Sequence, residues 1–165
     1  GELASGALVY DDYAHHPKEI AATLEAFRDT YPDHRLRVVF QPHTFTRTAA
    51  LKDEFAESLT LADEVLLLPI YGSKREQQGG AKTEEIETLM RAQGFESVSV
   101  FPSLESVQES LLSREFDADD IINNEYTISK IEELFDKTNF DVLLCGNKQI
   151  KNGISKTRNT MFANP

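Results

Sequence analysis

Side chains that can bind anions, transfer protons or accept hydrogen bonds gather in two short segments of the chain. They are Asp12, Tyr13 and His15 within residues 11–17, and His43 and Arg47 within residues 41–48. An arginine guanidinium binds a carboxylate or phosphate through paired hydrogen bonds, and an imidazole exchanges protons near neutral pH. A carboxylate such as Asp12 can accept a hydrogen bond from a ribose hydroxyl. Together these side chains predict a ligand-binding site.

Two other interpretations of the same residues stay open. In the first, Asp12 and the histidines only cap turns and the helix that follows. In the second, Asp12, His15 and His43 bind Zn²⁺ and the protein is a small metal-dependent hydrolase. Their spacing matches no strong metal-binding motif, so we predict no metal site.

Short apolar runs alternate with amphipathic stretches along the chain. The runs predict strands at residues 7–10, 37–40, 64–68, 98–101 and 140–145. The stretches predict a helix that begins at Pro17, three helices capped by Thr46 or Thr48, by Thr83 and by Ser103, and a last helix over residues 128–135. Residues 117–126 are interpreted as an acidic surface connector without chemistry. This alternation is typical of an α/β fold with a mostly parallel sheet and helices on both faces.

The sheet explains why the two polar segments belong together. Each follows a predicted strand, the first and the second along the chain. Ligands of open α/β sheets bind outside the carboxyl ends of the strands. If these two strands are neighbours, both segments share one cleft.

Composition excludes several classes of protein. The chain has 165 residues, with 17 basic and 28 acidic side chains and a net charge of −11. Such acidity argues against a general nucleic-acid binder, which needs a basic face. No apolar run approaches the roughly 20 residues of a membrane span. Cys145 is the single cysteine, so no intrachain disulfide forms, which fits a reducing, cytoplasmic location.

The two polar segments resemble the C-terminal domain of the Mur ligases. The first motif is VYDDYAHHPKEI at residues 9–20, and the second is VFQPHTFTRT at residues 39–48. ADEV at residues 62–65 and IYGSKRE at residues 70–76 continue the resemblance. The second motif is similar to that of the members that join L-alanine to UDP-N-acetylmuramate in peptidoglycan biosynthesis.

The resemblance implies a Rossmann-like lid domain at residues 1–150. Residues 151–165 contain basic but no acidic side chains and are interpreted as a basic tail. In such ligases an ATP-dependent step forms an acyl-phosphate, which the amine of L-alanine attacks. The N-terminal and central domains of the same enzyme would bind the UDP-sugar, the ATP phosphates and Mg²⁺. This sequence contains no Gly-x-x-x-x-Gly-Lys phosphate loop, so we expect a fragment that is inactive alone.

The resemblance also implies a role for each site residue. Asp12 would approach the ATP ribose, and Tyr13 would line the nucleotide pocket. His15 and His43 would face the amino acid and phosphate, and Arg47 would hold the carboxylate of L-alanine. Two departures are Thr44, where some members have a second arginine, and the sequence GNKQI at residues 146–150, where the family has a glycine-rich turn. The alternative function is a stand-alone nucleotide-binding or interaction module derived from this fold.

Overall fold

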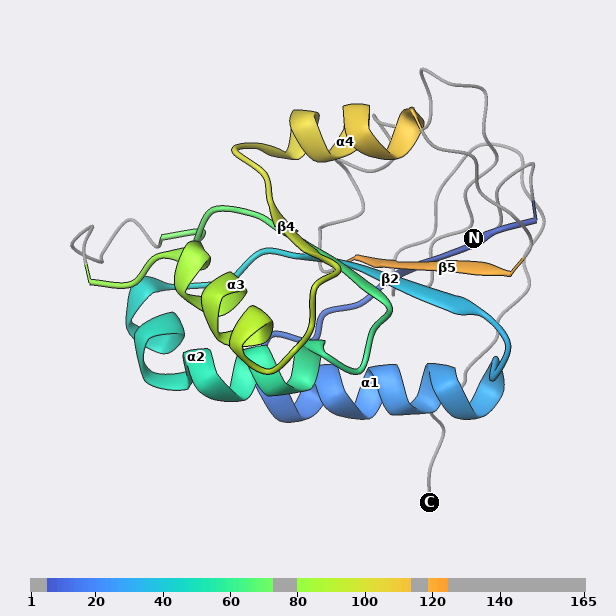
Figure 1. Ribbon diagram of the computed structural model, residues 1–165, viewed down its shortest axis with the longest axis horizontal. Coiled ribbons are helices and arrows are strands. Elements are labelled where there is room, and N and C mark those ends of the chain that lie inside the picture. Colours follow the sequence, from blue (N-terminus) through green and yellow to red (C-terminus); the bar gives the residue numbers. More distant parts are fainter. Residues whose placement is uncertain (1–5, 73–79, 114–118, 125–165) are drawn as a thin grey trace, which may run out of the picture.

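In the part of the chain that the structure describes, five parallel strands form a single sheet (Figure 1). The computed structural model describes residues 6–72, 80–113 and 119–124. The strands, in their order across the sheet, are β1 (Leu8–Asp11), β5 (Asp120–Asn124), β2 (Arg35–Phe40), β3 (Glu64–Leu67) and β4 (Val98–Val100). The helices are α1 (Pro17–Thr30), α2 (Phe45–Leu59), α3 (Thr83–Ala92) and α4 (Leu104–Leu112).

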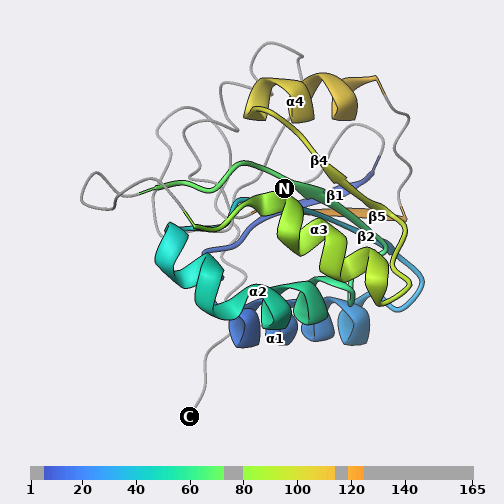
Figure 2. The same cartoon turned by 60° about the vertical axis from the view of Figure 1, so that its left-hand side comes forward.

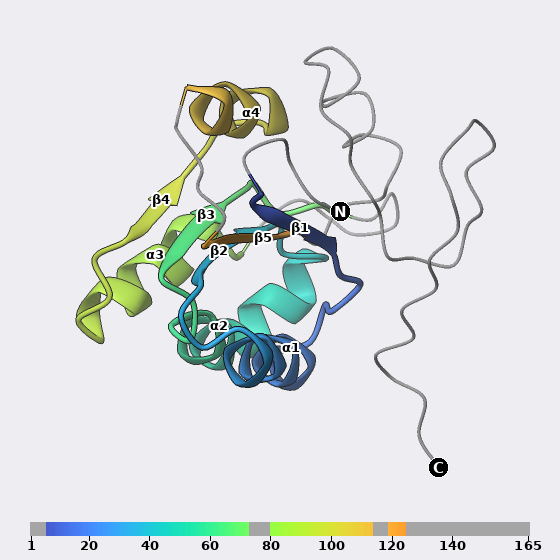
Figure 3. The same cartoon turned by 90° about the vertical axis from the view of Figure 1, so that its right-hand side faces the viewer.

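Helices cover both faces of the sheet, as predicted. Figures 2 and 3 show α1, α2 and α3 on one face and α4 on the other. The side chains of β2 alternate between the two faces, because successive residues of a strand point in opposite directions. Val38 joins the core under α1, α2 and α3, and Val39 joins a smaller core with Val107 and Leu111 of α4. Burial on both faces accounts for the continuous apolar runs in the sequence.

Two helices begin where the sequence predicts. α1 begins at Pro17, and the Nδ1 atom of His16 accepts a hydrogen bond from the Lys18 amide at 3.3 Å. α4 begins after Ser103, whose hydroxyl accepts a hydrogen bond from the Ser106 amide at 3.3 Å.

The predicted caps of the other two helices are wrong by a few residues. Thr44, rather than Thr46 or Thr48, caps α2 and accepts a hydrogen bond from the Arg47 amide at 3.3 Å. Thr48 lies buried within α2 and donates to the Thr44 carbonyl at 2.8 Å. Lys82 occupies the cap position of α3, because the Thr83 hydroxyl instead donates to the Leu68 carbonyl at 2.9 Å.

The predicted acidic connector contains a central strand, which is the main correction to the sequence interpretation. β5 pairs with both β1 and β2, and Ile121 lies beside Leu8 and Leu36. Ile121 and Ile122 supply the apolar surface that a central strand requires. The Asp120 carboxylate is buried, but an ion pair with Arg37 offsets its loss of hydration.

The strands β1 and β2 are therefore not neighbours, because β5 lies between them. All three strands are parallel, so the segments that follow β1 and β2 still leave the same edge of the sheet. The helix expected at residues 128–135, the strand expected at 140–145 with Cys145, the turn at 146–150 and the tail at 151–165 lie outside the described residues. Within residues 6–72, 80–113 and 119–124, no helix has the length and apolar character needed to cross a membrane.

Candidate functional site at the carboxyl edge of the sheet

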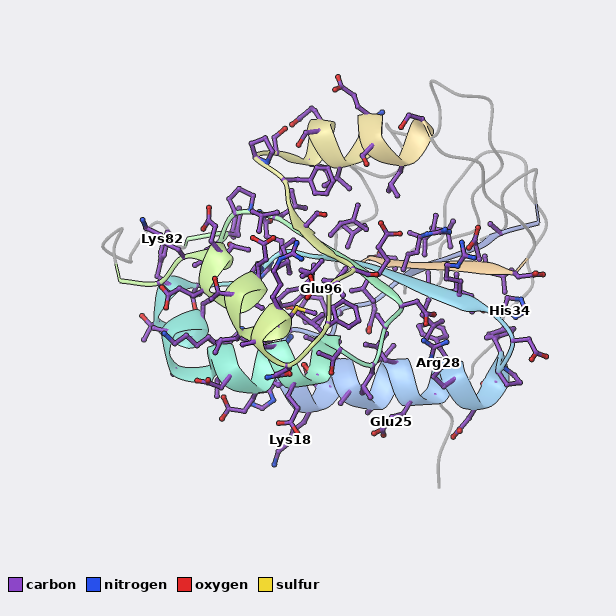
Figure 4. All side chains as sticks on the ribbon, viewed as in Figure 1. Lys18, Glu25, Arg28, His34, Lys82 and Glu96 are labelled. Carbon is purple, nitrogen blue, oxygen red and sulfur yellow. The ribbon has the colours of Figure 1, made fainter. Side chains whose placement is uncertain are left out.

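The structure brings the two polar segments to one edge of the sheet. Residues 12–16 link the end of β1 to α1, and residues 41–44 link the end of β2 to α2. Figure 4 shows Arg28 and His34 at one end of the molecule and Lys82 at the opposite end. His34 directly precedes β2, at the amino edge, so it is the one histidine far from this site.

His15 and His43 in these two loops and Arg47 in the first turn of α2 form a group of basic side chains, which we call the cationic cluster. Burial, together with the positive charges of His15 and Arg47, lowers the pKa of His43 below its ordinary value of 6.5. The His43 imidazole is therefore neutral at pH 7 and can accept a proton or a hydrogen bond. An anion bound in this cluster would be attracted by the charge of the Arg47 guanidinium and could donate or accept hydrogen bonds at the imidazoles.

Arg47 is placed by the start of α2. Its amide donates to the Thr44 hydroxyl, so its half-buried side chain leaves the first turn of the helix. Among the described residues, no carboxylate forms an ion pair with the Arg47 guanidinium. A guanidinium without an ion pair to a described carboxylate is suited to bind a carboxylate or phosphate ligand.

Asp12 has one satisfied and one unsatisfied carboxylate oxygen. Its Oδ1 atom accepts a hydrogen bond from the Ala14 amide at 3.1 Å, which is the turn-capping role considered above. Its Oδ2 atom is buried and has no hydrogen-bond partner among the described residues. Buried polar atoms almost always have partners in native proteins. The Oδ2 atom is therefore a candidate acceptor for a ligand hydroxyl.

Tyr13 and His15 lie next to Asp12 and differ in exposure. The Tyr13 side chain is 85% exposed, and its ring meets the His15 ring edge to face with centroids 5.2 Å apart. The Nδ1 atom of His15 lies 3.0 Å from the Tyr13 carbonyl oxygen. Because a carbonyl only accepts, the Nδ1 atom of His15 carries a hydrogen, and Nε2 is the ring nitrogen left for a ligand. His16 caps α1, and His15 also has a local contact, because its Nδ1 atom lies 3.5 Å from the Glu19 carboxylate in the first turn of that helix.

Asp11 is a further candidate residue at this edge, and the sequence interpretation did not assign it. It is the last residue of β1, and burial together with the negative charge of Asp12 raises its pKa from 3.8 to about 6. The signal in the sequence is a pair of adjacent acids directly after an apolar run. Asp11 adds a proton that is exchanged close to neutral pH at the edge of the candidate site.

The geometry does not favour the zinc hydrolase. Across the part of the chain that the structure describes, no three His, Cys, Asp or Glu side chains are placed to hold a metal ion. Asp12, His15 and His43 therefore do not form the metal site considered as an alternative.

Comparison with known proteins identifies the family. A sequence profile of the Mur ligase glutamate ligase domain matches residues 2–123. The chain belongs to the Mur ligase family. The resemblance inferred from the two motifs is thus confirmed for this Mur ligase domain, and so is the α/β fold with a parallel sheet.

Curated relatives of the Mur ligase domain carry the name UDP-N-acetylmuramate–L-alanine ligase. A protein of Pediococcus pentosaceus is 52% identical over 85 residues, which are 52% of this chain and 20% of that protein. A protein of Streptococcus sanguinis is 41% identical over 133 residues, which are 79% of this chain and 30% of that protein. The chain thus spans between a fifth and a third of the length of these relatives.

Solved structures show the same fold. UDP-N-acetylmuramate–alanine ligase from Thermotoga maritima matches 82% of this chain with a TM-score of 0.61 and 22% identity, over 27% of its own length. A murein peptide ligase from Psychrobacter arcticus matches 83% of this chain with a TM-score of 0.61 and 25% identity, over 27% of its length. A domain from Haemophilus ducreyi matches 83% of this chain with a TM-score of 0.56 and 22% identity, and 91% of that domain is covered.

Proposed function

We propose that this chain is the C-terminal ATP- and amino-acid-binding domain of a ligase that joins L-alanine to UDP-N-acetylmuramate in peptidoglycan biosynthesis. The observation that carries the proposal is the 41% identity to the Streptococcus sanguinis ligase over 79% of this chain. The enzyme would act in the cytoplasm, together with the N-terminal and central domains of the same polypeptide.

The nucleotide would bind beside Asp12 and Tyr13. The buried Oδ2 atom of Asp12 has no partner among the described residues, so it fits a hydrogen bond from a ribose hydroxyl. The exposed ring of Tyr13 offers an apolar face to a base or sugar.

The amino acid would bind at the cationic cluster. The Arg47 guanidinium would hold the carboxylate of L-alanine in a paired arrangement, which also sets the direction of the amine. The neutral imidazole of His43 would accept a hydrogen bond from that amine, and His15 would face the phosphate.

The reaction divides into two transfers. The muramyl carboxylate takes the terminal phosphoryl group of ATP, and ADP leaves. The amine of L-alanine then attacks the acyl carbon, the carbon–nitrogen bond forms, phosphate departs with the electron pair, and the amine loses a proton. This domain would contribute by orienting L-alanine and by excluding water from the acyl-phosphate.

Mg²⁺ would supply charge neutralisation to the phosphates, but the described acidic residues do not fit a magnesium site. No group of three metal-ligating side chains exists among them. We therefore assign the metal to the central domain and route no step of this domain through it.

A domain exchange tests the proposal. The C-terminal domain of the Streptococcus sanguinis ligase is replaced by this chain, and phosphate release is measured with ATP, UDP-N-acetylmuramate and each of several amino acids. We expect release that requires L-alanine, and none from the 165-residue chain alone.

One control variant and two contrary outcomes make the domain exchange decisive. The same exchange with Asp12→Ala should raise the KM for ATP by roughly 10-fold or more, as expected for a lost hydrogen bond to a carboxylate. A folded exchange protein that binds UDP-N-acetylmuramate but never uses L-alanine would contradict the proposal. If the chain alone then still bound ATP, the stand-alone nucleotide-binding module would be the better assignment.

A further inference from the structure

The chain that follows β3 runs beside the loop that carries His43. The Leu68 amide donates to the Phe40 carbonyl at 2.9 Å, and the Tyr71 amide donates to the Pro42 carbonyl at 2.8 Å. The Thr44 amide in turn donates to the Tyr71 carbonyl at 2.9 Å. These bonds continue the parallel pairing of β2 and β3 beyond both strands, to a bridge between His43 and Tyr71.

The backbone at Thr44 explains why the loop needs this support. Thr44 has φ 63° and ψ 134°, and it is the one non-glycine residue with positive φ in the described chain. A β-branched residue in this region is strained by roughly 1–3 kcal/mol and persists only where its surroundings hold it. The Tyr71 carbonyl holds the Thr44 amide, and Thr44 in turn caps the helix that presents Arg47.

Gly72 allows the supporting segment to pass close to α2. A Cβ atom at Gly72 would lie 2.6 Å from the Cε2 atom of Phe45, the first residue of α2. Any larger residue would displace the Phe45 ring or the segment itself. The fit between Gly72 and Phe45, directly after Tyr71, is therefore tight.

The Tyr71 side chain lies against His43 and not in the core. It is 61% exposed, and its ring centroid lies 5.5 Å from that of the His43 imidazole, at an interplanar angle of 37°. A large aromatic residue with so much exposed surface contributes little to folding. Its contact with a half-buried imidazole at the edge of the site points to a role in that site.

We propose that Tyr71 is a positioning residue, whose ring holds the His43 imidazole in its orientation and shields it from water while its backbone holds the strained Thr44 turn. The inference deepens the proposed function and rests on it for its role in catalysis. The ring would restrict rotation of the imidazole, and the backbone contacts would fix the distance between His43 and Arg47. Both effects would align the amine of L-alanine.

Nuclear magnetic resonance of the 165-residue chain tests the structural part of the proposal. The His43 ring signals are assigned with His43→Gln and titrated in the wild type, Tyr71→Phe and Tyr71→Ala. We expect Tyr71→Phe to match the wild type, because it keeps the ring. Tyr71→Ala should shift the His43 signals and move the pKa of His43 up towards 6.5, because water reaches the imidazole.

Matched variants exclude a general loss of structure. Tyr13→Ala removes a similarly exposed tyrosine that contacts His15, so it should change the His15 signals and leave the shape of the His43 titration. If Tyr71→Ala does not fold, Tyr71→Leu keeps an apolar side chain, but it is shorter than tyrosine and has no ring to cover the imidazole, so the His43 pKa should move in the same direction by a smaller amount. His43 signals and pKa that stay at wild-type values in Tyr71→Ala or Tyr71→Leu would overturn the proposal, as would a Tyr71→Phe variant that behaves like Tyr71→Ala.

Kinetics of the domain-exchanged ligase test the catalytic part. Tyr71→Ala should lower kcat/KM for L-alanine by about 10-fold, because misplaced groups lose the benefit of alignment, with little change in the KM for ATP. A loss of equal size for both substrates would assign Tyr71 to general stability instead. An exchange protein that is inactive even with Tyr71 present would contradict the proposed function alone, since the titrations would still decide whether Tyr71 positions His43.

Discussion

Arg37 of β2 and Asp120 of β5 form a buried ion pair inside the sheet. The exposed fractions of their side chains are 7% and 4%, and the Arg37 Nε atom also donates to the Glu64 carboxylate of β3 at 2.9 Å. One guanidinium thus joins three adjacent strands. It also compensates the acidic residue that made this part of the sequence resemble a surface connector.

Removal of the guanidinium should destabilise the whole domain. Arg37→Ala leaves the buried Asp120 carboxylate without its close partner, and we expect a loss of about 3–5 kcal/mol in the free energy of unfolding, measured by urea denaturation. Lys52→Ala is the control, because it breaks an ion pair with Glu85 in which about a third of each side chain is exposed. A loss from Arg37→Ala no larger than that from Lys52→Ala would contradict a structural role for the buried pair.

The raised pKa of Asp11 should appear in the pH dependence of stability. An unfolded Asp11 releases its proton near pH 3.8, whereas the folded protein keeps it until about pH 6. Between these values the folded state binds more protons, so stability decreases as the pH rises through this window. Asp11→Asn has no carboxyl group to ionise. The melting temperature of this variant should therefore rise relative to that of the wild type as the pH increases from 4 to 6.5. A difference in melting temperature between the two proteins that stays constant over this pH range would refute the assignment.

Arg47→Ala should separate amino-acid binding from nucleotide binding. In the domain-exchanged ligase we expect kcat/KM for L-alanine to fall roughly 10- to 100-fold, the range for a lost hydrogen bond to a charged group. The KM for ATP should stay close to the wild-type value. Arg47→Lys keeps the charge without the paired geometry, so its kcat/KM for L-alanine should lie between those of the wild type and Arg47→Ala. Equal losses for L-alanine and ATP would argue against the assigned role.

Thr44→Gly should stabilise the fold and impair the site. Glycine adopts positive φ without strain, and as a helix cap it is only slightly worse than threonine. We expect a gain of about 1 kcal/mol in unfolding free energy, after the greater flexibility of glycine in the unfolded chain is included. Thr46→Gly is the control. Thr46 lies two residues after Thr44, inside the first turn of α2, and lacks the positive φ, so this change should lose stability instead.

The same Thr44→Gly variant should bind L-alanine less well in the exchanged ligase, because the turn that carries His43 becomes looser. A variant with lower stability than the wild type, or with unchanged use of L-alanine, would show that the Thr44 turn stores no strain for the site.

The placement of the two polar segments at one edge of the sheet was predictable because each segment directly follows a strand. Asp12, Tyr13 and His15 follow one apolar run, and His43 and Arg47 follow another, so strand ends alone place them on one edge. Tyr71 and Asp11 were not assigned to the site. Tyr71 reaches His43 only through pairing beyond two strands, and the pKa of Asp11 depends on burial, which a sequence does not display.

The sequence by itself determined the class of fold, four of the five described strands, the starts of α1 and α4, and the family. These features follow from local patterns, namely apolar runs, helix caps and two long motifs. Only the tertiary structure decided which strand lies between β1 and β2. A short segment with acidic and amide side chains becomes a central strand when a distant guanidinium, Arg37, neutralises its buried carboxylate, and no local pattern reveals that partner.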